Sequence, residues 1–317
     1  MISVIIVDYK SIVKTCDFIE HFSKHATMSD LYHYIIIDNY IDSNADELLR
    51  NRYECEPFVQ NFFNDKFYLY KTCYGDIAYF SSKKNLGYAK ANNIGTKLAD
   101  FVYNDEYYII CNNDLRLSGS FDFNNFKKIF DSDPLISVIG PRIVGLDNER
   151  QSPCQKKSPF YLLITYQWSR FRPFCSKGDL IEINSSCYCY RVIGCFMLIK
   201  AKPFIEVGRF DEKTFMYGEE MILSEKMLMN NYKCYFYNDY VVIHEHGATV
   251  KKYSNTLQAD KWLYDSLYYY CVEYRKISVF LKVFAFINRL LNVSFICFKE
   301  SVKRVILFKN KVLGLKS

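Results

Sequence analysis

Several features that assign a chain to a familiar class are missing from this sequence. It contains no internal repeat and no low-complexity linker, so its 317 residues predict one large domain, or one domain with a small appendage. It also contains no recognisable nucleic-acid-binding motif, and we expect no nucleic-acid partner.

The cysteines lack the surroundings that disulfides or zinc sites require. There are 12 of them, but the chain opens with a short apolar run that Asp8 interrupts, which predicts a core strand rather than a secretory signal. Cys187 and Cys189 have no second pair at zinc-finger spacing. We therefore expect reduced thiols in a cytoplasmic protein.

The C-terminal region lacks a charge-free apolar run of the roughly 20 residues that a membrane-spanning helix needs. Residues 271–317 hold ten Lys and Arg against Glu273 and Glu300, whereas the rest of the chain holds 31 basic and 33 acidic residues. From about Ser278 the pattern is helical and amphipathic. Its apolar face comprises Val279, Val283, Phe286, Leu290 and Val293, and its polar face comprises Lys282, Arg289, Asn292, Lys299 and Lys303.

This pattern predicts that residues 251–317 form a basic helical extension. We expect it to lie peripherally on an anionic membrane surface, at the inner face of the cell membrane. The alternative is a C-terminal helix packed on the rest of the chain, or on a second subunit of a homo-oligomer.

The first half of the chain alternates short apolar runs with helical patterns. The expected strands are 3–7, 34–37, 76–80 and 107–111, and the expected helices are 11–25, 43–53 and 88–102. This alternation predicts an α/β fold with a doubly wound, mostly parallel sheet covered on both faces. Further on we expect a loop-rich segment over 145–190, a strand at 192–200, a helix at 217–230, and strands at 232–237 and 240–244.

Polar residues stand where the expected strands end. Asp8, Asp38, Asn85 and residues 112–114 each follow an apolar run. Ligands of doubly wound sheets bind beyond the carboxyl ends of the strands. The sequence therefore predicts a ligand site at this edge of the sheet.

The second half adds groups suited to acid–base and metal chemistry. Glu219 and Glu220 are adjacent at an expected helix start, and His244 and His246 follow an expected strand. A carboxylate can act as a general base, and an imidazole can bind a metal or contact phosphate. Adjacent acids at a helix N-terminus are also favoured by the helix dipole alone.

In their order, three segments resemble the family 2 inverting glycosyltransferases. They are "NLGYAKANNIG" at 85–95, "IICNNDLRL" at 109–117 and "FDEKTFMYGEEMILSEK" at 210–226. The nearest branch is the bacterial one that builds surface polysaccharides, often described as rhamnosyltransferase-like. The resemblance covers roughly residues 2–250 and implies a GT-A (Rossmann-like) catalytic domain over 1–250, with a nucleotide-binding half at about 1–117 and an acceptor half at about 118–250.

The resemblance implies transfer of a sugar from a nucleotide-diphosphate-sugar donor to a growing, lipid-linked glycan such as capsule or O-antigen. The residues it assigns to the donor are Asp8, Tyr9, Asp38, Asn85, Gly87, Asn92 and Asn113. A carboxylate suits ribose hydroxyls or a base N–H, and an aromatic ring can stack on the base. Ala91 departs from the glycine of many relatives, and Asp38 alone is equally suited to cap a helix.

The resemblance also implies a divalent cation, Mg²⁺ or Mn²⁺. Asp114 is the one carboxylate left at the position of the family's Asp-x-Asp motif, and phosphates and waters can complete the shell of such a hard cation. His244 and His246 are further candidate ligands.

Glu220 stands at the place of the family's general base. Glu replaces the commoner Asp there, and Ile222 stands where many relatives carry a further Asp, so Glu219 remains an alternative base. Asp211 is expected to shape the preceding turn or to contact the acceptor.

Two other functions fit parts of the sequence. A nucleotidyltransferase also uses a Rossmann-like sheet, but "VDYKSIVKTC" lacks the glycine-rich, basic phosphate loop expected after the first strand. A degenerate glycan-binding or scaffold subunit would have lost activity through the changes at positions 220 and 222.

Overall fold

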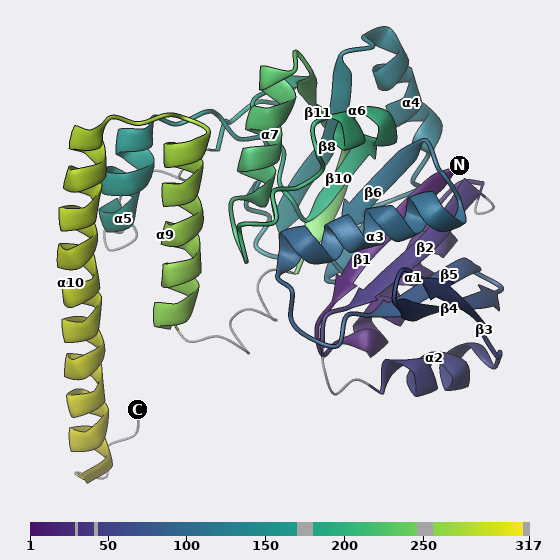
Figure 1. Cartoon of the computed structure of the whole chain (residues 1–317), viewed down its shortest axis with the longest axis horizontal. Helices are drawn as coiled ribbons and strands as arrows, with labels where there is room; N and C mark the ends of the chain where they lie inside the picture. The colour runs from purple at the N-terminus through teal and green to yellow at the C-terminus, as the bar shows by residue number, and fades with distance from the viewer. Residues whose placement is uncertain (29–30, 41–43, 170–179, 246–255, 313–317) are drawn as a thin grey trace. The chain divides into compact units, whose positions relative to one another are not determined.

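A computed structural model describes residues 1–28, 31–40, 44–169, 180–245 and 256–312. The chain divides into two compact units, shown in Figure 1. Unit 1 comprises Met1–Lys156 and Asp179–Ser254, and unit 2 comprises Lys157–Gly178 and Asn255–Ser317. The expected boundary near residue 250 stays a prediction, and the described residues 157–169 belong to the same unit as the C-terminal helices.

Unit 1 is built on an 11-stranded sheet. Its strands are β1 (Ile2–Asp8), β2 (Tyr32–Asp38), β3 (Phe58–Phe62), β4 (Asp65–Thr72), β5 (Gly75–Ser81), β6 (Tyr107–Cys111), β7 (Leu115–Leu117), β8 (Ile136–Gly145), β9 (Cys187–Cys189), β10 (Phe196–Lys200) and β11 (Lys233–His244). The order is β3-β4-β5-β2-β1-β6-β10-β8-β11-β7, with β9 paired to β11. The four consecutive strands β5, β2, β1 and β6 are parallel, as expected for a doubly wound sheet, and antiparallel pairs extend the sheet on either side.

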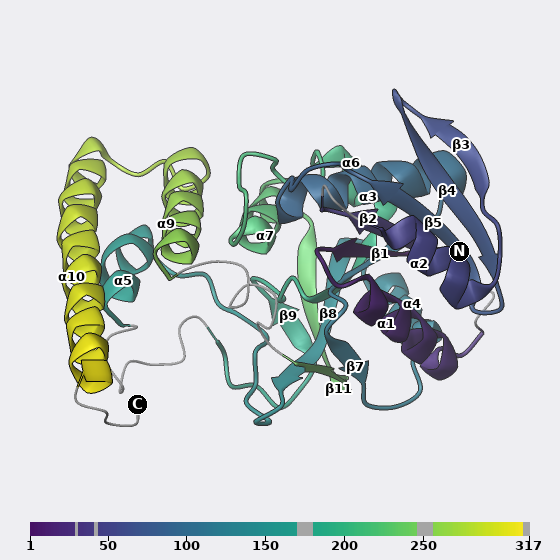
Figure 2. The ribbon, with the colours of Figure 1, turned by 90° about the horizontal axis from the view of Figure 1, so that it is seen from below.

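Helices cover both faces of this sheet, as Figure 2 shows. The helices of unit 1 are α1 (Ile12–His25), α2 (Ala45–Tyr53), α3 (Tyr88–Val102), α4 (Phe123–Ser132), α6 (Ala201–Glu206) and α7 (Glu219–Met229). Helices α1, α2 and α4 contribute to one buried apolar cluster, and α3, α6 and α7 contribute to another. Two separate cores sandwich the sheet, so its strand ends are held as a rigid edge.

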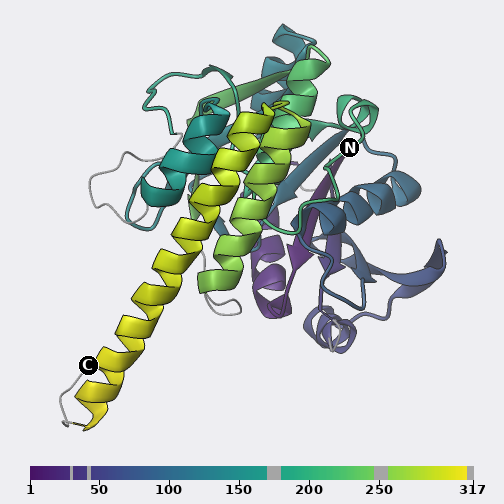
Figure 3. The same ribbon diagram turned by 60° about the vertical axis from the view of Figure 1, so that its left-hand side comes forward.

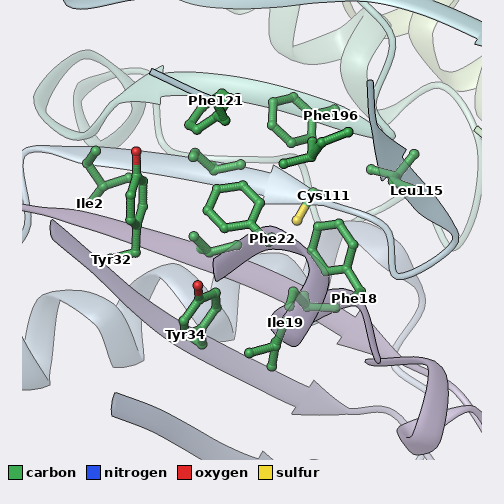
Figure 4. Packing of buried hydrophobic residues seen from close by; sticks show 14 of the residues in the cluster. Ile2, Phe18, Ile19, Phe22, Tyr32, Tyr34, Cys111, Leu115, Phe121 and Phe196 are labelled. Atoms are coloured by element: carbon green, nitrogen blue, oxygen red, sulfur yellow. The ribbon is translucent and has the colours of Figure 1, made fainter. Parts of the chain in front are cut away.

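Aromatic rings fill the core under α1. Phe22 packs against Tyr32, Tyr34 and Phe121, with ring centroids 5.2, 6.2 and 5.3 Å apart (Figure 4). All four side chains are fully buried. Edge-to-face and tilted packing of this kind stabilises a core beyond the burial of apolar area alone.

The register of the parallel strands brings the predicted polar residues to one edge. Asp8 is paired with Asp38, and Asp38 with Ser81. The segment expected to form two strands at 232–237 and 240–244 is the single strand β11, with a register shift between Tyr237 and Val241. That irregularity preserves one continuous pairing with β8, which carries β11 as far as His244.

Unit 2 is helical. It contains a π-helical turn η2 (Tyr161–Thr165), α5 (Tyr166–Ser169), α9 (Thr256–Glu273) and the long helix α10 (Val279–Val312), arranged side by side in Figure 3. The stretch Val279–Phe298 is long and apolar enough to cross a membrane, with a mean hydropathy of 1.7 and only 22% of it buried. The expectation that charged residues prevent a membrane-spanning helix here was therefore too strict, because this stretch is apolar enough even with Lys282 and Arg289.

Candidate active site

Asp114 and His244 meet just beyond the end of β6. Asp114 immediately precedes β7, and His244 ends β11, which pairs with β7 so that His244 lies opposite Leu115. The His244 Nε2 atom lies 3.4 Å from Asp114 Oδ1, which is longer than a good hydrogen bond. The pairing of β7 with β11 therefore brings together two of the three residues expected to bind a metal.

The surroundings keep this carboxylate charged. Burial alone would raise the pKa of Asp114, but the His244 imidazole and, more weakly, Lys14 hold it below its usual value. Gln151 Oε1 lies 2.9 Å from His244 Nδ1 and orients the ring. The sequence analysis did not anticipate Gln151, which lies 93 residues from its partner.

Asp114 and His244 fit a divalent cation. Asp114 Oδ1 is buried and has no hydrogen-bond donor among the described residues, and an oxygen with a neighbouring imidazole nitrogen suits Mn²⁺ or Mg²⁺. Within the described ranges no group of three or more His, Cys, Asp or Glu side chains could hold a metal ion. His246 lies outside the described residues, so the pair supplies part of a shell that phosphates and water would complete.

Glu219 and Glu220 begin α7 but have different surroundings. Glu220 is 21% exposed in its side chain, and its Oε1 accepts a hydrogen bond of 2.8 Å from Arg191 Nη1. Glu219 is 3% exposed, and its Oε1 has no hydrogen-bond partner in the described part of the chain. At the start of α7, Glu220 therefore has a cationic partner, whereas Glu219 is buried away from solvent.

Burial and the charge of Glu220 raise the pKa of Glu219 to about 8. A buried carboxyl beside a second acid favours its neutral form, because two adjacent carboxylates cannot both ionise cheaply. Glu219 therefore keeps its proton near neutral pH.

Cys195 locates Glu220 relative to Asp114. After burial, the charges of Asp114 and Glu220 are the largest causes that raise the pKa of this thiol. Cys195 also accepts a hydrogen bond of 2.9 Å from the backbone N–H of Asn112 through its carbonyl. A Cβ at the preceding Gly194 would lie 3.7 Å from Glu220 Oε2, so Glu220 lies beside the start of β10. The hydrogen bond from Asn112 brings the segment that leads to Asp114 to the same point.

Asp8 is engaged by the protein itself. Its Oδ1 accepts hydrogen bonds of 2.8, 2.7 and 3.1 Å from Ser11, Thr15 and Asn113, and its Oδ2 accepts one of 3.2 Å from the Ser11 backbone. Asn113 also donates to the hydroxyls of Ser11 and Thr15 at 2.8 Å. The two residues join α1 to the segment that carries Asp114, while direct contact of either with a nucleotide stays a prediction.

Asp38 and its neighbour Asn39 organise the next strand end. Asp38 accepts hydrogen bonds from the Tyr79 hydroxyl at 2.9 Å and from the Tyr40 backbone at 3.1 Å. Asn39 donates to Asn85 Oδ1 at 3.0 Å and accepts from the Leu86 backbone at 2.8 Å. Asn39 thus anchors the loop that holds two of the predicted donor residues.

Gly87 allows this loop to touch the segment before Glu219. Its φ is +79°, and a Cβ at this position would lie 2.2 Å from the Phe215 carbonyl oxygen. The backbone N–H of Tyr88 donates to that oxygen at 2.9 Å. A glycine is required both by the backbone conformation and by the close approach.

The next two asparagines, Asn92 and Asn93, have different hydrogen-bond partners. Asn92 donates to the Tyr88 carbonyl at 3.0 Å, and its Oδ1 is buried without a partner among the described residues. Asn93 instead clasps the 210–212 turn, because it donates to the Phe210 carbonyl at 2.9 Å and accepts from the Phe210 N–H at 3.0 Å. In the same turn Asp211 accepts from the Lys213 N–H at 2.9 Å, which fits the expected shaping of that turn.

Tyr9 has an aromatic and a basic neighbour. Its ring lies 5.8 Å from that of Tyr40 in an edge-on arrangement, and Lys10 Nζ lies 4.3 Å from the Tyr40 centroid. These residues follow β1 and β2 directly, where the resemblance placed the nucleoside. Lys10 and Tyr40 are additions to the predicted site.

Comparisons with known proteins agree with this architecture. No protein-family model and no curated protein matches the sequence. The crystal structure of GalNAc-T7 with UDP, GalNAc and Mn²⁺ is similar, with a TM-score of 0.53 and 16% identity over 77% of this chain and 43% of that one. So is the mannosyltransferase PcManGT from Pyrobaculum calidifontis in complex with GDP-Man and Mn²⁺, with a TM-score of 0.50 and 11% identity over 98% of this chain and 79% of that one.

These likenesses show that the chain has the fold of GT-A glycosyltransferases, which confirms the expected fold class. The chain spans less than half the length of the GalNAc-T7 chain.

Proposed function

We propose that the chain is an inverting glycosyltransferase of the rhamnosyltransferase-like type. It transfers a sugar from a nucleotide-diphosphate-sugar to a growing, lipid-linked surface polysaccharide such as capsule or O-antigen, at the inner face of the cell membrane. The observation that carries the proposal is the contact of Asp114 with His244 at the carboxyl end of the central strands, with Glu220 beside Gly194 at the adjoining start of β10. The GT-A fold and the nucleotide-sugars bound by its structural neighbours support it.

Glu220 is the general base of this reaction. It takes the proton of the acceptor hydroxyl while that oxygen forms a bond to the anomeric carbon, and the bond from this carbon to the diphosphate oxygen breaks with its electron pair. Attack opposite the leaving group inverts the anomeric centre in one step. Glu220 suits this role better than Glu219, because it is partly exposed, whereas Glu219 is buried and its raised pKa keeps it protonated near neutral pH.

Asp114 and His244 act on the leaving side. Both are nearly buried, and their mutual contact and Gln151 hold them in place. A bound Mg²⁺ or Mn²⁺ would take them as ligands and supply positive charge to the departing diphosphate. Tyr9 and Tyr40 offer ring faces to the nucleoside, and Asn39, Asn85 and Gly87 set the adjoining loop.

Thermal melting with nucleotide ligands tests this function. A set of nucleoside diphosphates and nucleotide-sugars, each with Mn²⁺ or Mg²⁺, should include at least one that raises the melting temperature only when the cation is present, because ligands that bind the native state stabilise it. The same nucleotide-sugar should be hydrolysed slowly or transferred to an acceptor. A scaffold subunit would show neither effect, and a protein stabilised only by nucleoside triphosphates would favour a nucleotidyltransferase.

A further inference from the structure

Helix α10 carries a largely exposed apolar surface, at whose margin Phe284 and Phe295 also pack on the rings of Phe160 and Trp168. We call this surface the outer face of α10. It comprises Phe280, Val283, Phe284, Ile287, Leu290, Leu291, Phe295 and Phe298, whose side chains are 40–81% exposed. Eight large apolar side chains in helical succession are far more than the scattered exposed hydrophobics of an ordinary protein surface.

The opposite side of the same helix is packed, and it buries polar side chains beside Ala285 and Ile296. Asn288 and Asn292 are buried and donate hydrogen bonds of 3.0 Å to the carbonyls of Leu163 and Gln167. The Asn288 Oδ1 atom accepts a hydrogen bond of 2.8 Å from the indole N–H of Trp168. The inner side of α10 is therefore held to the 161–169 segment by amide hydrogen bonds.

An ion pair extends this polar contact to α9. Arg289 binds the buried carboxylate of Asp260 at 2.5 Å, and its guanidinium lies 4.4 Å from the ring centroid of Tyr264. The Tyr264 hydroxyl donates to the Ala285 carbonyl at 3.0 Å. Polar groups thus hold α9 and α10 together.

This arrangement inverts that of a helix in water, which buries its apolar stripe and exposes its polar one. Polar side chains that face a helical partner while apolar ones face outward are typical of helices in contact with lipid. A core helix of a soluble protein can be equally long and apolar, but such a helix is mostly buried. Only 22% of Val279–Phe298 is buried. The outer medium that suits α10 is apolar.

We propose that the outer face of α10 inserts into the acyl-chain region of one leaflet of an anionic membrane. The chemistry of the partner follows from charge, because residues 271–317 carry ten basic and two acidic residues, which complement anionic headgroups. One leaflet suffices, because Lys261 and Asp265 are exposed on α9 and would have to be buried if unit 2 crossed the bilayer. The inference does not rest on the proposed sugar transfer.

The inversion changes what holds the protein to the membrane. The sequence analysis placed Arg289 and Asn292 on a polar face available to the surface, but both are used inside unit 2. Insertion of the apolar face supplies most of the attachment, and this contribution does not depend on salt. The basic residues add a smaller, screened contribution.

Vesicle binding by the full-length chain tests the proposal. Vesicles of equal parts phosphatidylcholine and phosphatidylglycerol should bind the protein in ~0.1 M salt and retain most of it in ~1 M salt. The triple change Phe280→Gln, Ile287→Gln and Leu291→Gln should reduce the partition coefficient at least ~100-fold, because each removes an inserted side chain without harming the helix.

A matched control makes the same changes in unit 1. Phe58, Leu146 and Met229 are 61, 72 and 66% exposed, so Phe58→Gln, Leu146→Gln and Met229→Gln remove comparable apolar surface away from α10. This variant should bind vesicles as the unchanged protein does. Equal losses in the two variants would show non-specific adsorption and overturn the proposal.

A measurement without any substitution covers the case in which the outer-face variant fails to fold. Both tryptophans of the chain, Trp168 and Trp262, lie in unit 2, and the ring of Trp168 lies 5.8 Å from that of Phe295. Lipids brominated near the headgroup should quench their fluorescence. Binding without quenching, or complete release by ~1 M salt, would show attachment by charge alone and overturn insertion.

The remaining outcome is a second copy of the chain on the same face. In that case the full-length protein ignores vesicles, and light scattering finds an oligomer that the outer-face variant converts to a monomer. Such a result would replace the membrane with a subunit interface.

Discussion

Two groups of acids at the same edge of the sheet differ in how well the protein satisfies them. At the ends of β1 and β2, Asp8 and Asp38 receive their hydrogen bonds from neighbouring hydroxyls and backbone N–H groups. Around the end of β6, Asp114 and Glu219 each keep a buried oxygen without a donor among the described residues. Burying an unsatisfied carboxyl oxygen costs free energy. The second group can therefore still bind a ligand through these oxygens, whereas the oxygens of the first group are already hydrogen-bonded within the protein.

The acids whose oxygens are hydrogen-bonded within the protein stabilise the structure of the site, whereas those with an unsatisfied oxygen can bind a ligand or transfer a proton. From the sequence, Asp8 and Asp38 were expected to contact the nucleotide, Asp114 to bind the metal, and Glu219 to be the alternative to Glu220 as the base. Substitutions of Asp8 or Asp38 should therefore change stability, whereas substitutions of Asp114 or Glu220 should change turnover. Substitution of the buried Glu219 should change the pH dependence of stability.

The largest effect is expected at Glu220. Glu220→Gln removes the base and should lower turnover roughly 10²–10⁴-fold while nucleoside-diphosphate binding is retained. Turnover and donor-induced shifts in melting temperature measure the two quantities. Glu47→Gln, also in the first turn of a helix and exposed, serves as the control.

This prediction has a defined way to fail. If Glu219→Gln shows the loss and Glu220→Gln stays active, the buried member of the pair is the base. The comparison would then need revision, because a carboxyl that retains its proton near neutral pH would have to accept one.

Asp114→Asn should follow in size. Loss of this charge removes the electrostatic partner of the departing diphosphate and should reduce turnover at least ~100-fold. Calorimetry should show that cation-dependent binding of the nucleoside diphosphate is lost too. Asp131→Asn, at an exposed aspartate of α4, should leave both unchanged. Unaltered cation dependence in Asp114→Asn would remove Asp114 from the site.

Asp8→Ala should act on stability. The change leaves the hydroxyls of Ser11 and Thr15 and the amide of Asn113 without their shared acceptor, at a cost of about 2–4 kcal/mol in the free energy of unfolding. Chemical denaturation measures it. Asp8→Asn keeps an acceptor oxygen and should recover most of the loss, whereas a stable Asp8→Ala protein that has lost donor binding would identify Asp8 as a ligand contact.

The smallest effect concerns the pH dependence set by Glu219. Its folded-state pKa is raised above that of the unfolded chain by burial and by Glu220, so its contribution to stability is fully present below about pH 4.5 and is lost as the pH rises through about 8. Glu219→Gln should remove this loss and stabilise the protein by roughly 1–3 kcal/mol at pH 9 relative to pH 5. If the free energy of unfolding depends on pH in the same way in the two proteins, the pKa of Glu219 is not raised in the folded state.

The sequence predicted the parallel centre of the sheet well, because buried parallel strands are nearly continuous apolar runs separated by helical patterns. It also predicted that Asp114 and His244 share a site. It could not predict the ion pair of Arg191 with Glu220, because Arg191 follows an irregular segment whose path depends on tertiary contacts. Nor could it tell Asn92 from Asn93, because adjacent positions in one helix face different neighbours and only the packed structure decides which one reaches Phe210.

For a related reason, the sequence could not predict that the polar face of α10 packs on the protein while its apolar face is exposed. Helical periodicity shows that two faces differ, but not which of them meets the protein. Here Asn288, Arg289 and Asn292 find partners in residues 161–169 and in α9, more than 20 positions away.

The contact of Gly87 with Phe215 has a consequence for how this protein can be recombined. The first half of the chain carries the loop that would hold the donor, and the second half carries the Phe215 carbonyl against which that loop packs. A Cβ at position 87 would lie 2.2 Å from this carbonyl oxygen, so only glycine fits there. Exchanging the first 117 residues for those of a protein with another donor sugar would succeed only if the incoming segment also supplies a glycine at position 87. Any chimera that exchanges the first half must therefore preserve this joint, and a library of such chimeras should be filtered on position 87 before any other.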